Sequence, residues 1–130
     1  MALKVELKPG ERVILGGCLV TNEGPRTKLR IQGAAPILRE KDIMTPETAT
    51  SPARRIYLVV QAMYLSGDTA SHHTEYFALV RDIISAAPST TPLVENINNR
   101  ILTGDLYKAL REACSLIAYE QELVENAKGR

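Results

Sequence analysis

Short runs in which hydrophobic and polar residues alternate occupy the first third of the chain. Leu3, Val5 and Leu7 are separated by charged residues, which predicts a strand with one buried face. Further strands are expected at 13–15, 18–21, 28–31 and 37–38. Because turn-forming residues follow most of these runs, we expect a small antiparallel β-sheet of consecutive hairpins.

Glycine, proline and asparagine mark the turns between these strands. Pro9-Gly10 predicts one turn, and Asn22-Glu23-Gly24-Pro25 predicts a hairpin loop. Gly16-Gly17 predicts a tight turn, because glycine adopts backbone angles that other residues resist. This pair is not followed by the Lys-Ser/Thr sequence of a phosphate-binding loop, so a strand turn is the better interpretation.

The spacing becomes helical after a connector rich in threonine and proline at 44–55. Ser51 before Pro52 predicts an N-cap with proline in the first turn. Asp68 and Thr91 are expected to cap the second and third helices, and Gly67 and Gly104 to end the first and third. The residues expected to face inward are Ile56, Val59, Val60 and Met63; Phe77, Val80, Ile83 and Ile84; Leu93, Ile97 and Ile101; and Leu106, Leu110, Ala113, Ile117 and Leu123.

Together these patterns predict an α+β protein: a small N-terminal antiparallel β-sheet followed by a C-terminal bundle of four helices. Short links between the helices indicate that neighbours are antiparallel. We expect a β-rich lobe at 1–45 and an all-α lobe at 46–130, with a linker at about 44–52.

Composition is ordinary for a globular protein. Of the 130 residues, 45% are hydrophobic and 24% are charged. No run approaches the roughly 18 apolar residues of a membrane span, and the charges of Lys4 and Glu6 fall where a signal peptide would be apolar. Cys18 and Cys114 lie far apart and are expected to be reduced thiols of a cytosolic protein.

The charge is unevenly divided. The whole chain carries a net charge of only +1, but residues 1–45 hold eight basic and five acidic residues, a net charge of +3. The remaining residues hold eight basic and ten acidic ones. A cationic β-rich half could attract phosphates or could simply be a solvated strand face. All six aromatic residues lie in the helical half, so the strands offer no platform on which bases could stack.

Catalytic and metal-binding patterns are missing from the sequence. His72-His73 is best interpreted as a polar first turn of a helix, with a metal-binding or pH-sensing role as the alternative, because adjacent helical residues point about 100° apart. Glu120 and Glu122 are interpreted as a solvated helix face. No nucleophile stands in a suitable motif, so we expect neither an enzyme nor a cofactor or metal site.

Arg54-Arg55 is an anomaly, because two cations in the first turn of a helix oppose its dipole. The pair could be screened by solvent or paired with Glu47. Alternatively, it could contact an RNA phosphate or an acidic partner.

Several blocks resemble the FlbT family of flagellin regulators. They are Leu-Lys-Pro-Gly-Glu-Arg at 7–12, Ala-Pro-Ile-Leu-Arg-Glu-Lys-Asp-Ile at 35–43, Thr-Pro-Glu-Thr-Ala at 45–49, Ala-Arg-Arg-Ile-Tyr-Leu at 53–58, Met-Tyr-Leu-Ser-Gly-Asp at 63–68, Tyr-Phe-Ala-Leu-Val-Arg-Asp-Ile at 76–83 and Gly-Asp-Leu-Tyr-Lys-Ala-Leu at 104–110. The resemblance implies a cytosolic bacterial protein that associates with the untranslated leader of flagellin mRNA. It also implies lowered translation or message lifetime, and a functional link to a second regulator, FlaF.

The β-rich half also resembles, more weakly, the carbon storage regulator family of RNA-binding repressors. The matching residues are Gly10-Glu11, Ile14, Gly16, Arg30-Ile31, Ala35-Pro36 and Arg39-Glu40. In that family strands of two chains interlock into a dimer, and RNA is bound by first-strand residues and a last-strand arginine. The resemblance places these functions on Lys8 and Arg39. The segment between Pro36 and Arg39 is a few residues shorter than in that family.

Two hypotheses follow. In the first, the protein is an RNA-binding repressor, with Arg39 contacting a phosphate or base and Lys8, Arg12, Arg30 and Lys41 giving electrostatic support. In the second, it is an adaptor or chaperone-like assembly factor that acts through a partner such as FlaF or flagellin without touching RNA. A homo-oligomer, most simply a dimer, is expected in either case, with no membrane association.

Overall fold

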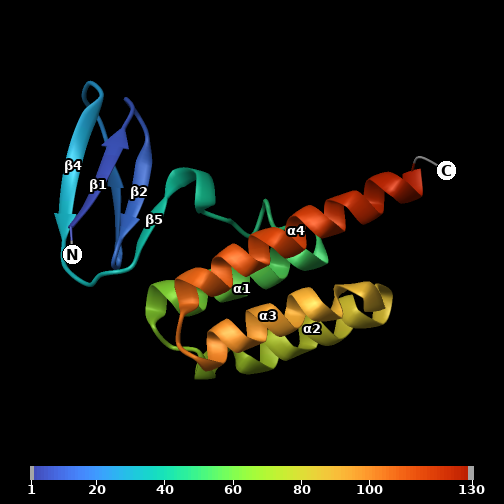
Figure 1. The fold of residues 1–130 in the computed structure, drawn as a ribbon. Helices are drawn as coiled ribbons and strands as arrows, with labels where there is room; N and C mark the ends of the chain where they lie inside the picture. The colour runs from blue at the N-terminus through green and yellow to red at the C-terminus, as the bar shows by residue number, and fades with distance from the viewer. Residues whose placement is uncertain (1, 129–130) are drawn as a thin grey trace. The chain divides into compact units, whose positions relative to one another are not determined.

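A computed structural model describes residues 2–128, which form five strands followed by four α-helices (Figure 1). The chain divides into two compact units, Met1–Ile43 and Met44–Arg130. The first unit holds the strands and the second the helices, so the α+β class and the order of elements predicted from the sequence are confirmed.

The first unit contains two small antiparallel sheets. Its strands are β1 (Ala2–Leu7), β2 (Arg12–Leu15), β3 (Cys18–Thr21), β4 (Thr27–Gln32) and β5 (Ile37–Arg39). β1 pairs with β4 in one sheet, and β2 lies between β3 and β5 in the other. A single meander of consecutive hairpins is therefore wrong, because β1 and β4 pair across the whole β2–β3 hairpin.

The β2–β3 connection is the one expected hairpin that forms. Leu15 pairs with Cys18, so Gly16 and Gly17 make a two-residue turn. Gly16 has a φ of 60°, which only glycine adopts without strain at the first position of such a turn. Pro9-Gly10 also forms a turn, in which Gly10 has a φ of 80°.

Asn22 explains why the loop at 22–25 is a crossover between sheets and not a hairpin. Its Nδ2 donates to the carbonyl oxygens of Leu7, Lys8 and Pro25 at 3.0, 3.2 and 3.0 Å. Its backbone N–H donates to Glu11 O at 2.9 Å. The side chain thus ties the loop to the end of β1 and sends the chain to the other sheet.

The two sheets enclose a common core. Val5 and Leu7 from β1 and Val13 from β2 are buried together. Five partly buried side chains pack against them: Leu15, Val20, Leu29, Ile31 and Ile37. The period-two alternation of β1 therefore places Val5 and Leu7 inward and its charged residues outward, while Leu3, near the start of the strand, is 41% exposed.

The second unit contains four α-helices: α1 (Pro52–Ser66), α2 (His73–Ala86), α3 (Thr91–Leu102) and α4 (Leu106–Lys128). Short 3₁₀ turns lie at Glu40–Asp42 (η1, in the first unit), Ala70–His72 (η2) and Pro88–Thr90 (η3). α4 packs against α1 and α3, and α1 also packs against α2.

The first helix begins and ends as predicted. Ser51 Oγ accepts from Arg54 N at 3.2 Å, and Gly67 ends the helix with a φ of 72°. Two other caps were predicted wrongly. Asp68 accepts from Ser71 within the 3₁₀ turn that precedes α2, and Thr91 is the first residue of α3 and not its cap.

Most of the expected helical core is buried, but α2, α3 and α4 each need a correction. Val94 and Leu116 are buried, whereas the predicted core residues beside them, Leu93 and Ile117, are only half-buried. Ile56, Val60 and Ile97 are fully enclosed, but Phe77 is 51% exposed and its neighbour Tyr76 is buried in its place. The Tyr76 hydroxyl donates to Asn98 Oδ1 at 2.5 Å, and burial raises the pKa of this phenol above its ordinary value. A partner for the hydroxyl allows a tyrosine to replace phenylalanine in the core.

Gln61 fastens the connector to the helices. This buried side chain accepts from Met44 N at 2.7 Å and donates to Met44 O at 2.9 Å.

Among the described residues, no helix is long and apolar enough to cross a membrane.

Candidate nucleic-acid interface

Cationic side chains cover the outer face of the β1–β4 sheet. Lys4 lies directly opposite Arg30, and Glu6 lies opposite Lys28. Since Val5, Leu7 and Leu29 of the same strands face the core, these four charged residues face solvent. Lys4, Lys28 and Arg30 take part in no ion pair within residues 2–128.

Glu6 is the acidic residue of this face, and Arg26 neutralises it. Arg26 Nη1 lies 2.5 Å from Glu6 Oε1. The hydrogen bond and charge of Arg26, followed by the charges of Lys28 and Lys8, hold the pKa of the Glu6 carboxyl below its usual value of 4.5. Both side chains remain about half exposed, so the pair adds little stability. It does neutralise the negative charge that Glu6 brings to the face.

A pocket of about 280 Å³ adjoins this face at the end of β1. Four cationic residues line it, together with two acidic and two apolar residues: Lys8, Arg26, Arg39 and Lys41; Glu6 and Glu11; Val5 and Leu7. Three segments supply the basic groups, because Lys8 follows β1, Arg26 precedes β4, and Arg39 and Lys41 lie in β5 and η1.

Backbone contacts help to position these groups. The backbone N–H of Lys8 donates to Glu11 Oε1 at 2.9 Å, which ties the turn after β1 to the residue before β2. Arg39 Nη2 lies 3.5 Å from the carbonyl oxygen of Lys4, so its guanidinium group reaches towards β1. All four cationic residues of the pocket are exposed.

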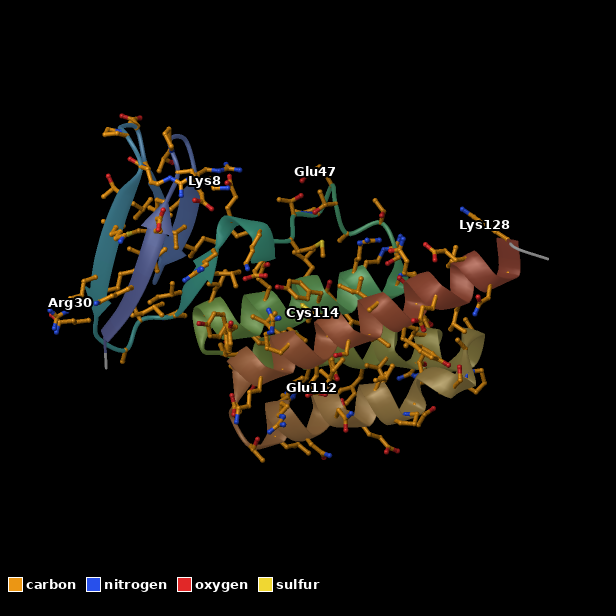
Figure 2. The ribbon with its side chains drawn as sticks, turned by 45° about the horizontal axis from the view of Figure 1, so that its top comes forward. Lys8, Arg30, Glu47, Glu112, Cys114 and Lys128 are labelled. Atoms are coloured by element: carbon orange, nitrogen blue, oxygen red, sulfur yellow. The ribbon has the colours of Figure 1, made fainter. Side chains whose placement is uncertain are left out.

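The five predicted contact residues are thus divided among three places. Lys8, Arg39 and Lys41 share the pocket. Arg30 projects from the outer face of β4, away from Lys8 (Figure 2). Arg12 is paired with Glu40 at 2.9 Å, so its charge is largely neutralised.

Sequence reasoning omitted three cations that the structure adds to these surfaces: Lys4, Arg26 and Lys28. A signal for the last two was present. Arg26, Lys28 and Arg30 follow one another at period two, which places them on one face of a strand.

The other residues singled out from the sequence lie in the second unit. His72 is half-buried and His73 exposed, and the His73 ring lies against that of Phe77 in a tilted arrangement, with centroids 5.8 Å apart. No cluster of three or more potential metal ligands occurs among the described residues.

Glu120 is a correction, since it is not simply a solvated residue: its Oε2 accepts from Ala53 N at 2.9 Å. This carboxylate, and not Glu47, supplies negative charge at the helix end that carries Arg54 and Arg55. Glu47 forms no ion pair among the described residues.

Comparisons with known proteins give the family. The family model described as "Flagellar protein FlbT" matches residues 3–124. A "Probable flagellum biosynthesis repressor protein FlbT 1" of Bradyrhizobium diazoefficiens is 58% identical over 95% of this chain and 85% of that protein. A "Probable flagellum biosynthesis repressor protein FlbT" of Rhodopseudomonas palustris is 50% identical over 95% of this chain and 98% of that protein.

A "Flagellum biosynthesis repressor protein FlbT" of Caulobacter vibrioides is 38% identical over 94% of this chain and 89% of its own length. No solved structure matches. The family model and these relatives cover nearly the whole chain, both the cationic strands and the helices. The chain therefore belongs to the FlbT family, and its similarity is to repressors of flagellum biosynthesis.

Proposed function

We propose that this protein is a post-transcriptional regulator that binds the 5′ untranslated region of flagellin mRNA and represses its translation or promotes its decay. Two observations support the proposal. The relatives are named repressors of flagellum biosynthesis. The carrying observation is the pocket in which Lys8, Arg39 and Lys41 converge from separate segments.

The pocket suits an RNA strand better than a neutral ligand. Its basic groups can bind phosphates, and each phosphate neutralised releases counterions, which makes binding depend on salt. The planar guanidinium group of Arg39 can also donate two hydrogen bonds to one base edge or stack on a base. Arg39 is accordingly the proposed specificity contact, with Lys8 and Lys41 as phosphate contacts.

The experiment is a binding titration with a flagellin leader RNA at two salt concentrations. We expect salt-dependent binding, which Arg39→Glu weakens by about 1–3 kcal/mol if the arginine contacts a base. Arg81→Glu, at an exposed position in α2, is the matched control because it changes the net charge equally. No detectable binding, or binding that does not respond to salt, would contradict direct recognition.

The proposal places the protein in the cytoplasm with mRNA as its partner. We also propose a homodimer. The dimer does not require interlocked strands, because β1 pairs with β4 and β2 pairs with β5 within one chain. A sedimentation measurement of the intact protein checks the dimer. If the protein is a monomer at every concentration used for RNA binding, the proposed dimer is wrong.

A second candidate function is that of an adaptor acting through a partner such as FlaF or flagellin. A groove of about 650 Å³ in the helical unit favours it, with apolar walls formed by Pro52, Ile83, Ala86, Ala87, Leu123 and Val124. Val124 is 47% exposed there, as an apolar face that accepts a partner helix would require. Co-purification that Val124→Glu abolishes, with no RNA binding by the unmodified protein, would select this function.

A further inference from the structure

The outer face of β1 and β4 contains a pair of like charges that does not stabilise the fold. Lys4 and Arg30 stand directly opposite each other, and like charges in this position destabilise a sheet. Neither side chain has an anionic partner within residues 2–128. A repulsive pair on an otherwise small sheet indicates a ligand that supplies the missing negative charge.

The spacing of the cations along β4 indicates the shape of this ligand. Arg26, Lys28 and Arg30 succeed one another on the same face, and two residues of a strand span about 6.8 Å. This repeat is comparable to the distance between successive phosphates of an extended nucleic-acid strand. A point anion would engage one of these groups, whereas a strand laid along β4 engages them in turn.

The chemistry of the face restricts what it can recognise. Residues 1–43 contain no aromatic side chain, so the face offers bases no aromatic platform on which to stack. Gln32, opposite Ala2, is the remaining long side chain of this face on β4. Contacts to phosphates position a strand but carry no sequence information.

The face is continuous with the pocket. Glu6 and Arg26 belong to both, since they line the pocket and also form the ion pair on the outer surface. Lys8 extends the row of outward residues Lys4 and Glu6 along the chain. A single strand of RNA whose base is held beside Arg39 can therefore continue over this face.

We propose that Lys4, Lys28 and Arg30 form a track for the phosphate backbone of single-stranded RNA, next to the pocket and independent of base sequence. The inference rests on the proposed function in taking RNA as the ligand. It adds a second surface, with general affinity and no specificity.

The test uses the full-length protein with Lys28→Gln and Arg30→Gln combined, a uridine homopolymer and a flagellin leader RNA. The double variant should lose tenfold or more in affinity for both RNAs at low salt. The slope of log affinity against log salt should fall by about 1.4, since each phosphate of a single strand contributes about 0.7. Arg39→Glu should instead weaken leader binding more than homopolymer binding.

Two controls separate binding from folding and from net charge. Arg81→Gln with Lys128→Gln removes the same charge from exposed positions of the helical unit and should leave the slope unchanged. Thermal unfolding of the double variant should occur at about the same temperature, because Arg30→Gln removes a like-charge opposition to Lys4 while Lys28→Gln removes an attraction to Glu6.

The outcomes are distinguishable. An unchanged salt slope for the homopolymer in the double variant overturns the track, even if the leader still binds. Poly-glutamate serves as an acidic polypeptide probe. If the double variant loses affinity for poly-glutamate but not for RNA, the track is also overturned, since the face would then recognise acidic protein. A reduced slope with no preference for the leader over the homopolymer supports the track and contradicts the proposed function.

Discussion

The carboxylate of Glu120, in the second half of α4, accepts a hydrogen bond from the backbone N–H of Ala53 at the start of α1, 67 positions earlier. The first N–H groups of a helix have no partner inside it, and its N-terminus carries partial positive charge. Glu120 therefore satisfies one such group with an anion. It also offsets Arg54 and Arg55, which lie in the same turn with unfavourable charge.

Removal of this contact should lower stability. We expect Glu120→Ala to reduce the free energy of unfolding by about 1 kcal/mol, because it removes a helix cap and the charge beside the dipole. Glu120→Gln should lose less, since its amide oxygen still accepts. Denaturant unfolding measures the change. Glu122→Ala, at an exposed position two residues away, is the control, and an equal loss there would refute a specific cap.

Asn22 should be decisive for the strand unit. Asn22→Asp replaces a donor to three carbonyl oxygens by a carboxylate that repels them. We expect a loss of about 2 kcal/mol or more in unfolding free energy. In hydrogen-exchange measurements, the substitution should speed exchange of the β1 and β3 amides and leave that of the helical amides unchanged. Glu23→Gln, at the adjacent exposed position, should change neither measurement.

Glu6 links stability to pH. Because its pKa is lowered in the folded protein, its pair with Arg26 stabilises the fold above the ordinary pKa of 4.5. This contribution is lost as pH falls through the folded pKa. The difference in unfolding free energy between the unmodified protein and Glu6→Gln should therefore be largest near neutral pH and vanish in acid. A difference that grew in acid would contradict this sign.

The same substitution should act oppositely on RNA. Glu6→Gln removes the acidic residue of the outer face and releases Arg26, so homopolymer affinity should rise and the salt slope should steepen. A titration at neutral pH measures both. Weaker binding by the folded variant would show that Glu6 positions the surface instead of opposing it.

Gln61 should control the connector. Gln61→Glu retains an acceptor for Met44 N but loses the donor to Met44 O and buries a charge. We expect a destabilisation of about 1–3 kcal/mol, with faster proteolysis at 44–50. Gln61→Met keeps the volume but leaves both Met44 backbone groups without this partner, and should be destabilising to a similar extent. If both variants were as stable as the unmodified protein, the clamp would have no energetic role.

Patterns within a few residues determined the elements of this protein. Alternation at Leu3, Val5 and Leu7 predicted a half-buried strand, and Ser51 before Pro52 predicted the start of α1. Strand and cap preferences depend on near neighbours, so sequence alone could determine them. Sequence alone could not determine which of Tyr76 and Phe77 is buried, because adjacent aromatic residues fit the helical period almost equally. The hydrogen-bond partner Asn98, on another helix, favours burial of the tyrosine.

Tertiary structure decided which strands pair and which charges meet. Alternation in β1 fixes its buried face but not its partner, and β4 was selected by the shared core and by the Asn22 side chain. Arg39 comes near Lys8, and Glu120 near Ala53, only after packing joins distant segments. Such pairings depend on the closure of long loops, whose cost is repaid by burial of the whole core, so no local pattern records them.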